Sequence, residues 1–280
     1  MKINLPFNER LNVRISQKSS FLCVGLDPDM KKIPAHVKYE KNPVKVFIEQ
    51  IIESTKDFAV AYKANLAFYE SEGLNGFEAL RTISTCLPTD TMLILDGKKG
   101  DVGHTAEKYA QALFDNLKAD AVTVNPFMGF DSVNPFLQNP AKGAFILALT
   151  SNPGSVDFQH LQIGLDPMYI YTAKKAKDWN TNKNCGLVVG ATDIEGMQII
   201  RKAVPELPFL VPGVGAQGGS LEEVIRYGRD QSGAGLLINV SRDIIYAGKE
   251  KDFAKKVKEK AQYYVTEMRK IMHTSWNYIQ

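Results

Sequence analysis

Two short segments of the chain place lysines and carboxylates or amides at every second residue, a spacing that could assemble a catalytic cluster. One is AYKAN, with Lys63 and Asn65, and the other is LDGKKGD, with Asp96 and Lys98 at this spacing and Asp101 just beyond them. Side chains two residues apart on a strand share a face, so each pair should converge on one site. Charges of alternating sign compensate one another and keep each group ionised despite desolvation. Such a cluster can hold an ammonium group against charge that develops on a substrate.

An ion-pair network that only orders the structure is the competing interpretation, and Lys63 or Asp96 alone would be weak evidence for function. Four charges from two neighbouring segments favour the functional interpretation. A divalent cation held by Asp27, Asp96 and Asp101 is disfavoured, because the interleaved lysines already supply the positive charge. We therefore expect no metal at these residues.

A glycine-rich segment, PGVGAQGGS at residues 212–220, has the composition of a phosphate-binding loop. Its glycines let backbone N–H groups approach a ligand. The segment Ser220-Leu221-Glu222-Glu223 reads as a capping box, and the N-terminus of the helix that it begins would favour an anion. Arg242, after Ser241, could clamp the same anion with two hydrogen bonds. Taken alone, a glycine-rich loop is more often a plain turn, so the position of this segment in the fold decides whether it can bind a phosphate.

Eight short apolar runs rich in β-branched residues alternate with segments of helical periodicity, which indicates a parallel sheet of βα units. The runs are residues 21–27, 58–65, 91–97, 121–127, 144–150, 186–192, 209–215 and 235–241. Eight such units predict a single (β/α)8 TIM barrel over residues 1–280. In that fold the chemistry lies on the loops after the strands, which is where the charged residues and the glycine-rich segment fall.

The segments between these runs carry apolar stripes at helical spacing. Helices are expected around residues 47–52, 77–87, 106–117 and 194–204, and from residue 220 onward. Asn42-Pro43 is a cap residue followed by proline, as at a helix start. Residues 28–45 are expected to form an enlarged first βα loop, and a long C-terminal helix over residues 249–273 is expected to cover the bottom of the barrel.

The composition fits a water-soluble enzyme and excludes several other classes. Of 280 residues, 44% are hydrophobic and 23% are charged. The net charge is +3, from 34 basic and 31 acidic residues, which is too small for a nucleic-acid-binding surface. No apolar stretch is long enough to span a membrane and the N-terminus has no secretory signal, so a cytoplasmic location is expected. Cys23, Cys86 and Cys185 are far apart, which predicts buried thiols rather than a zinc site or disulfides.

The motifs together resemble those of the orotidine 5'-phosphate decarboxylase family. LDGKKGDVGHT is similar to its DxKxxDIxxT signature, and AYKANLAFYE, ALTSNPGS, VPGVGAQGG and NVSRDIIYA resemble its other blocks in the same order. The resemblance covers residues 21 to about 247 and is strongest to a longer, divergent bacterial subgroup. Two positions depart from the commonest pattern. Val102 replaces isoleucine where the residue is expected to pack against the base, and Ser241 stands where shorter members have glycine.

The resemblance implies decarboxylation of orotidine 5'-monophosphate (OMP) to UMP and CO₂ without a metal or an organic cofactor. It implies a catalytic tetrad of Lys63, Asp96, Lys98 and Asp101, with Lys98 as the proton donor to C6 of the pyrimidine. Asp101 and Thr105 would reach the site from the partner subunit of a homodimer. No nucleic acid or membrane partner is implied.

The same resemblance assigns the substrate contacts. Asp27 would bind ribose hydroxyls together with Lys63, Ser151 would hydrogen-bond the pyrimidine, and Gln217 and Arg242 would hold the phosphate. The predicted substrate-binding residues are Asp27, Asn65, Thr105, Ser151, Pro212, Gly213, Gln217, Ser241 and Arg242.

Three alternatives stay open at this point. A Mg²⁺-dependent sugar-phosphate decarboxylase or a hexulose-phosphate synthase shares the DxKxxD spacing. An aldolase could form a Schiff base at Lys63 or Lys98. A catalytically silent barrel could bind a phosphate compound as a scaffold or sensor.

Overall fold

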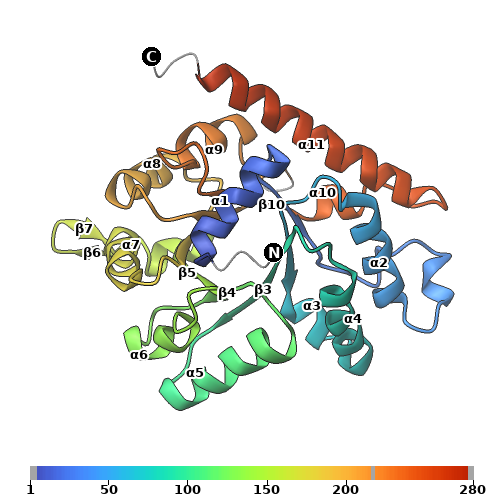
Figure 1. Cartoon of the computed structure of the whole chain (residues 1–280), viewed down its shortest axis with the longest axis horizontal. Coiled ribbons are helices and arrows are strands. Elements are labelled where there is room, and N and C mark those ends of the chain that lie inside the picture. The colour runs from blue at the N-terminus through green and yellow to red at the C-terminus, as the bar shows by residue number, and fades with distance from the viewer. Residues whose placement is uncertain (1–4, 216–217, 277–280) are drawn as a thin grey trace.

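A closed ring of eight parallel strands forms the centre of the computed structural model, which describes residues 5–215 and 218–276 (Figure 1). The order around the ring is β1-β10-β9-β8-β5-β4-β3-β2. Each strand overlaps one of the eight predicted runs, so the predicted TIM barrel is confirmed. The bounds are β1 Leu22–Gly25, β2 Ala61–Asn65, β3 Met92–Lys99, β4 Ala121–Val124, β5 Gly143–Leu149, β8 Cys185–Val189, β9 Phe209–Pro212 and β10 Leu236–Val240.

Helices alternate with these strands and cover the outside of the ring (Figure 1). Two starts match their predicted caps, because the side chain of Asn42 accepts from the N–H of Lys45 and that of Ser220 accepts from the N–H of Glu223. The outer helices are α2 Pro43–Thr55, α4 Gly73–Cys86, α5 Gly103–Ala110 with its π-helical continuation Gln111–Asn116, α7 Met168–Trp179, α8 Ile194–Ala203, α9 Leu221–Gly228 and α11 Phe253–Trp276.

Several short elements lie in the loops between strands and helices. Some directly follow a strand, and others, such as the hairpin, lie outside the ring of strands. They are α3 Leu66–Glu70, α6 Phe130–Val133, α10 Arg242–Ile245, the 3₁₀ turns Val37–Tyr39, Asn134–Phe136 and Pro153–Asp157, and a hairpin of β6 Gln162–Ile163 and β7 Asp166–Pro167.

The bottom of the barrel is covered by an unpredicted N-terminal helix, α1 Phe7–Lys18, which crosses the ring in Figure 1. The ring of Phe7 meets Phe145 edge-on, with 5.8 Å between centroids. The side-chain amide of Asn8 donates to the carbonyl oxygen of Cys185, at the start of β8. Arg10 pairs with Asp120, just before β4, at 3.0 Å. These partners lie at the N-terminal ends of the strands, so α1 occupies the place that was predicted for the C-terminal helix.

The C-terminal helix α11 instead packs on the side of the barrel against α2 and α9 (Figure 1). It begins at Phe253 rather than at residue 249, where the buried Phe253 ring stacks on Phe47 of α2 at 5.7 Å. The first βα loop likewise ends at residue 42 rather than 45, because Pro43 already occupies the first turn of α2. None of the described helices is both long and apolar enough to cross a membrane.

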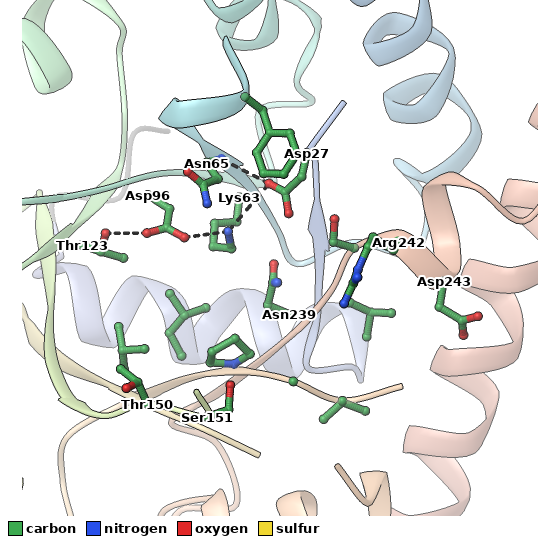
Figure 2. Close-up of a pocket in the computed structure, with 18 of the residues that line it drawn as sticks. Asp27, Lys63, Asn65, Asp96, Thr123, Thr150, Ser151, Asn239, Arg242 and Asp243 are labelled. Carbon is green, nitrogen blue, oxygen red and sulfur yellow. Dashed lines mark hydrogen bonds and ion pairs between the residues drawn. The ribbon is translucent and has the colours of Figure 1, made fainter. Parts of the chain in front are cut away.

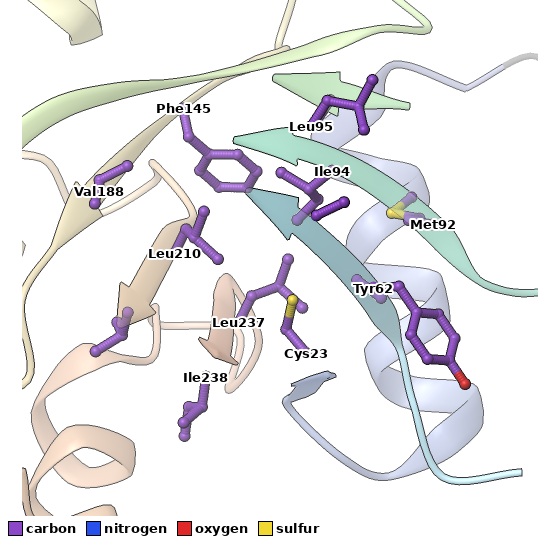
Figure 3. Close-up of a cluster of buried hydrophobic side chains, with 14 of the residues drawn as sticks. Cys23, Tyr62, Met92, Ile94, Leu95, Phe145, Val188, Leu210, Leu237 and Ile238 are labelled. Carbon is purple, nitrogen blue, oxygen red and sulfur yellow. The ribbon is translucent and has the colours of Figure 1, made fainter. Parts of the chain in front are cut away.

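Apolar side chains fill the lower interior of the ring, as Figure 3 shows for Cys23, Ile94, Phe145, Leu210 and Leu237. Because apolar side chains pack closely here, the polar side chains of the strands lie at the other end of the ring, at the C-terminal ends of the strands. The predicted burial of the cysteines is confirmed for Cys23 and Cys185. It is wrong for Cys86, which is only half-buried because it ends α4 on the outer layer.

Candidate active site

A cavity of about 510 Å³ opens at the C-terminal ends of the strands. Its wall combines polar side chains with a few apolar ones, and it lies where this fold places its ligands. Ten of the predicted site residues line it: Asp27, Lys63, Asn65, Asp96, Lys98, Ser151, Pro212, Gly213, Ser241 and Arg242.

The centre of the cavity holds a carboxylate, Asp96, between two ammonium groups, of which Figure 2 shows that of Lys63. Oδ2 of Asp96 accepts from Nζ of Lys63 at 2.8 Å, and Oδ1 of Asp96 accepts from Nζ of Lys98 at 2.7 Å. Asp27 approaches Lys63 from the other side, with 3.9 Å between Oδ1 and Nζ. The predicted convergence of β2 and β3 residues on one site is therefore present in the structure.

The environment fixes the charge of each member of this cluster. Burial by itself would raise the pKa of Asp96, but Lys63 and Lys98 hold it well below the usual range. Burial would lower the pKa of Lys63, but Asp27 and Asp96 raise it above its ordinary value. The side chain of Lys63 is 5% exposed and that of Lys98 is 46% exposed. Lys63 thus serves as a fixed internal charge, whereas Lys98 presents its ammonium group to the cavity.

Thr123 of β4 lines the cavity beside Asp96 and was not singled out from the sequence. Its hydroxyl donates to Oδ1 of Asp96 at 2.8 Å and accepts from the backbone N–H of Lys98 at 2.9 Å. The pairing of β3 with β4 is irregular between Leu95 and Lys99, and Lys98 has a left-handed φ of 45°. A side chain other than glycine pays about 1–2 kcal/mol for that conformation. The bulge and Thr123 together therefore fix the direction of Lys98 beside Asp96.

Asp27 is positioned by the loop after β1 and by Tyr246, another residue that was missed. The backbone N–H of Asn65 donates to Oδ1 of Asp27 at 3.3 Å. The hydroxyl of Tyr246 donates to the carbonyl oxygen of Asp27 at 3.1 Å and accepts from the N–H of Asp29 at 2.6 Å. Burial raises the pKa of Tyr246 to about 12, so it stays a neutral donor. The tyrosine lies in the NVSRDIIYA block, but only the packing shows which loop it supports.

The glycine-rich loop after β9 forms the opposite wall. Gly213 has a left-handed φ of 104°, and the N–H of Gly219 bonds to its carbonyl oxygen at 3.1 Å. A Cβ at Gly219 would lie 2.5 Å from that of Ala191, so only glycine fits there. Gln217, a predicted phosphate contact, lies outside the described residues.

Ser241 and Arg242 follow β10 beside this loop. Ser241 has a φ of −109°, so the position does not require glycine. Its hydroxyl donates to the carbonyl oxygen of Gly25 at 3.2 Å. Arg242 starts α10 and points into the cavity in Figure 2. Among the described residues no ion pair involves Arg242, so its charge is available to an anion.

The loop after β5 carries Ser151 and is held by an amide that sequence reasoning did not single out. Gln159 accepts from the N–H of Thr150 and donates to its hydroxyl, both at 2.8 Å. A Cβ at Gly190 would lie 2.8 Å from the backbone nitrogen of Ser151. Asn239, a buried residue of β10, also lines the cavity and was missed.

Two predicted site residues do not reach the cavity of their own chain. Asp101 accepts from the N–H of Val102 and Thr105 lies in the first turn of α5, and neither is among the described residues that line the cavity. Val102, expected against the base, is 55% exposed. The loop that carries these residues packs closely against the loop after β4. A Cβ added at Gly100 would lie only 2.9 Å from the carbonyl oxygen of Asn125.

Comparison with known proteins agrees with the geometry. The model of the orotidine 5'-phosphate decarboxylase / HUMPS family matches residues 20–257. The chain belongs to this family. An orotidine 5'-phosphate decarboxylase from Christiangramia forsetii is 47% identical over 91% of this chain and 94% of its own length.

Solved structures of the family have the same barrel. A Leishmania donovani OMP decarboxylase has a TM-score of 0.79 and 38% identity over 94% of this chain and 99% of its own. A UMP synthase from the same organism has a TM-score of 0.81 and 40% identity over 93% of this chain. This chain spans only 57% of that UMP synthase.

Within residues 5–215 and 218–276, no group of three or more histidine, cysteine or acidic side chains is arranged to hold a metal ion. The carboxylate nearest the centre, Asp96, has both oxygens occupied by lysines and Thr123. Lys63, Lys98 and Asp96 can act on a ligand through their charges. Fixed ammonium groups face a cavity whose far wall suits a phosphate.

Proposed function

We propose that this protein is an orotidine 5'-phosphate decarboxylase that converts OMP to UMP and CO₂. The observation that carries the proposal is the pairing of Asp96 with both Lys63 and Lys98 in a cavity that also receives Arg242. The family and the named relatives support the same activity.

The difficulty of this reaction lies at C6 of the pyrimidine. Loss of CO₂ breaks the bond from C6 to the carboxylate carbon and leaves the bonding electrons on C6. An ammonium group at about 4 Å and an effective dielectric constant near 20 stabilises such a charge by roughly 4 kcal/mol. Lys98 is placed to supply it and then to donate its proton to C6, after which the amine regains a proton from solvent. Asp96 and Thr123 keep the lysine oriented throughout.

One contact does not account for an enzymatic rate enhancement, which takes about 8–23 kcal/mol. The rest of the stabilisation comes from binding interactions that form only in the transition state and from charged groups that are already in position before the reaction. We assign the phosphate to Pro212, Gly213, Gln217, Ser241 and Arg242. The ribose belongs to Asp27, Lys63 and Asn65, and the pyrimidine to Ser151. Asp27 is held against the Lys63 ammonium group, which suits it to accept hydrogen bonds from ribose hydroxyls.

The active form is proposed to be a homodimer in which Asp101 and Thr105 complete the partner's site. Both residues lie outside the cavity of their own chain, next to exposed apolar side chains of the loops after β3 and β4. Phe127 is 77% exposed and Val102 is 55% exposed, and burying them would favour association. No organic cofactor or metal is proposed, and a cytoplasmic location remains a prediction.

A spectrophotometric assay tests the function. The purified protein should convert OMP to UMP, with loss of the orotate absorbance, and the rate should survive exhaustive treatment with EDTA. Loss of activity with EDTA and its return with Mg²⁺ would favour the sugar-phosphate alternative. Covalent trapping by borohydride with substrate would show a Schiff-base enzyme. An inert but folded protein that still binds UMP would be a scaffold or sensor, and each of these results would overturn the proposal.

A further inference from the structure

A second polar cluster connects the C-terminal helix to the phosphate end of the cavity. The hydroxyl of Tyr264 donates to Oδ2 of Asp243 at 2.6 Å, and Nζ of Lys260 lies 3.1 Å from the same oxygen. Tyr264 and Lys260 are one turn apart on α11 and therefore share a face. Asp243 follows Arg242 on α10 and lines the cavity with it. Three side chains thus join an outer helix to the wall of the active site.

The same tyrosine supports the glycine-rich loop. Gly215 has a left-handed φ of 82°, and a Cβ there would lie 2.7 Å from the hydroxyl oxygen of Tyr264. Tyr264 is 5% exposed, so its hydroxyl is fixed between the loop backbone and Asp243. Tyr264 contacts both segments that border the proposed phosphate position.

Charge explains why this contact matters to an anionic ligand. Asp243 is a carboxylate on the wall of a cavity that is proposed to bind a phosphate dianion, and like charges repel. The Tyr264 hydroxyl and the Lys260 ammonium group offset that charge. In Figure 2 the side chain of Asp243 points away from that of Arg242. The cluster therefore draws the carboxylate toward α11 and leaves Arg242 to the ligand.

We propose that Tyr264 and Lys260 are positioning residues for the phosphate group of the substrate. Both act through Asp243, Tyr264 acts also through the loop at Gly215, and neither contacts the reacting atoms. The inference rests on the proposed function, because it takes the phosphate of OMP as the ligand at this end of the cavity. It also assigns α11 a part in substrate binding besides its packing on α2 and α9.

The decisive experiment compares ligands with and without the phosphate. Tyr264→Phe should raise the KM for OMP and the inhibition constant of UMP about five- to tenfold, with kcat nearly unchanged. The inhibition constant of uridine should not change. The matched control is Tyr263→Phe, which removes a hydroxyl from the neighbouring, 55% exposed ring and should behave as wild type.

A double variant separates charge compensation from a general structural effect. In an Asp243→Asn background, Tyr264→Phe should no longer weaken UMP binding fivefold or more, because the carboxylate that the hydroxyl offsets is gone. Should Tyr264→Phe fail to fold, Lys260→Gln is tested in its place. This variant should raise the inhibition constant of UMP roughly two- to threefold, and the rise should become smaller as the salt concentration increases.

Three results would overturn the inference: equal weakening of UMP and uridine, no weakening of either, or an undiminished effect in the Asp243→Asn background. The proposed function fails separately, through a wild-type protein that does not turn over OMP. A wild type that is active and a Tyr264→Phe variant that binds UMP normally would refute only the role of α11.

Discussion

Lys98 is the side chain that the proposed reaction requires, because its half-exposed ammonium group faces the cavity while Asp96 binds it at 2.7 Å. Lys98→Ala should lower kcat by roughly 10³-fold or more, since it removes the charge and the proton donor from the transition state. UMP binding should stay within a few-fold of wild type. Lys99→Ala is the matched control, because Lys99 points to Glu70 and Tyr109 instead. Formation of UMP by Lys98→Ala at a rate close to that of wild type would rule out the assigned role.

Asp96 gives the site a predictable pH dependence. Its folded pKa lies below the unfolded value of about 3.9, so its stabilising contribution is complete above that pH and is lost as the pH falls toward the folded pKa. Asp96→Asn leaves Lys63 buried with only the more distant Asp27. The free energy of unfolding at pH 7 should fall by about 3–5 kcal/mol.

Urea unfolding of wild type and Asp96→Asn at pH 7, 5 and about 3.5 measures this difference. It should be equal at the two higher pH values and smaller at the lowest. Asp157→Asn, at an exposed carboxylate, should show little difference at any pH. A gap between wild type and Asp96→Asn that widens in acid would contradict the assigned ion pairs.

At the scale of elements, Arg201 joins the ends of two helices to the start of a strand. From α8 its guanidinium donates to the carbonyl oxygens of Leu207 at 2.7 Å and Gly228 at 2.5 Å, and it lies 3.6 Å from the centre of the Phe209 ring. Burial lowers its pKa to about 10, which leaves it charged at neutral pH.

Arg201→Met should lower the free energy of unfolding by about 3 kcal/mol, because several buried carbonyls lose their donor. Thermal and urea unfolding measure the loss, and kcat of the folded enzyme should be retained because Arg201 lies at the bottom of the barrel. Arg226→Met removes an exposed pair with Glu222 and should cost less than about 0.5 kcal/mol. Equal losses in the two variants would show that the buried bonds do not carry this stability.

At the scale of the whole molecule, the proposed dimer makes two different variants complementary. Lys98→Ala and Asp101→Ala should each be inactive as homodimers. After mixing and subunit exchange, half of the dimers are mixed and hold one native site of two, so about a quarter of wild-type activity should return. Activity that stays absent after exchange, with mixed dimers verified by mass, would place Asp101 in its own chain's site. Mixing Lys98→Ala with Lys63→Ala is the control and should restore nothing.

The eight strands and the barrel could be predicted because each depends on local patterns. Runs of apolar residues and capped helical stripes, such as that after Asn42, are visible within a dozen residues of sequence. Helix α1 was missed, because its place is defined by contacts to Phe145, Asp120 and Cys185. The same limit explains why α11 was assigned to the wrong face of the barrel.

The amino-acid sequence by itself determined which charged groups exist, that they end neighbouring strands of a barrel, and which family the chain resembles. Only the tertiary structure decided that Thr123 and both lysines share the carboxylate of Asp96 and that Tyr264 bonds to Asp243 on the cavity wall. The reason is physical. Hydrogen bonds and pKa shifts depend on distances of a few ångströms and on burial. Packing sets these between residues far apart in the chain, and no local periodicity records them.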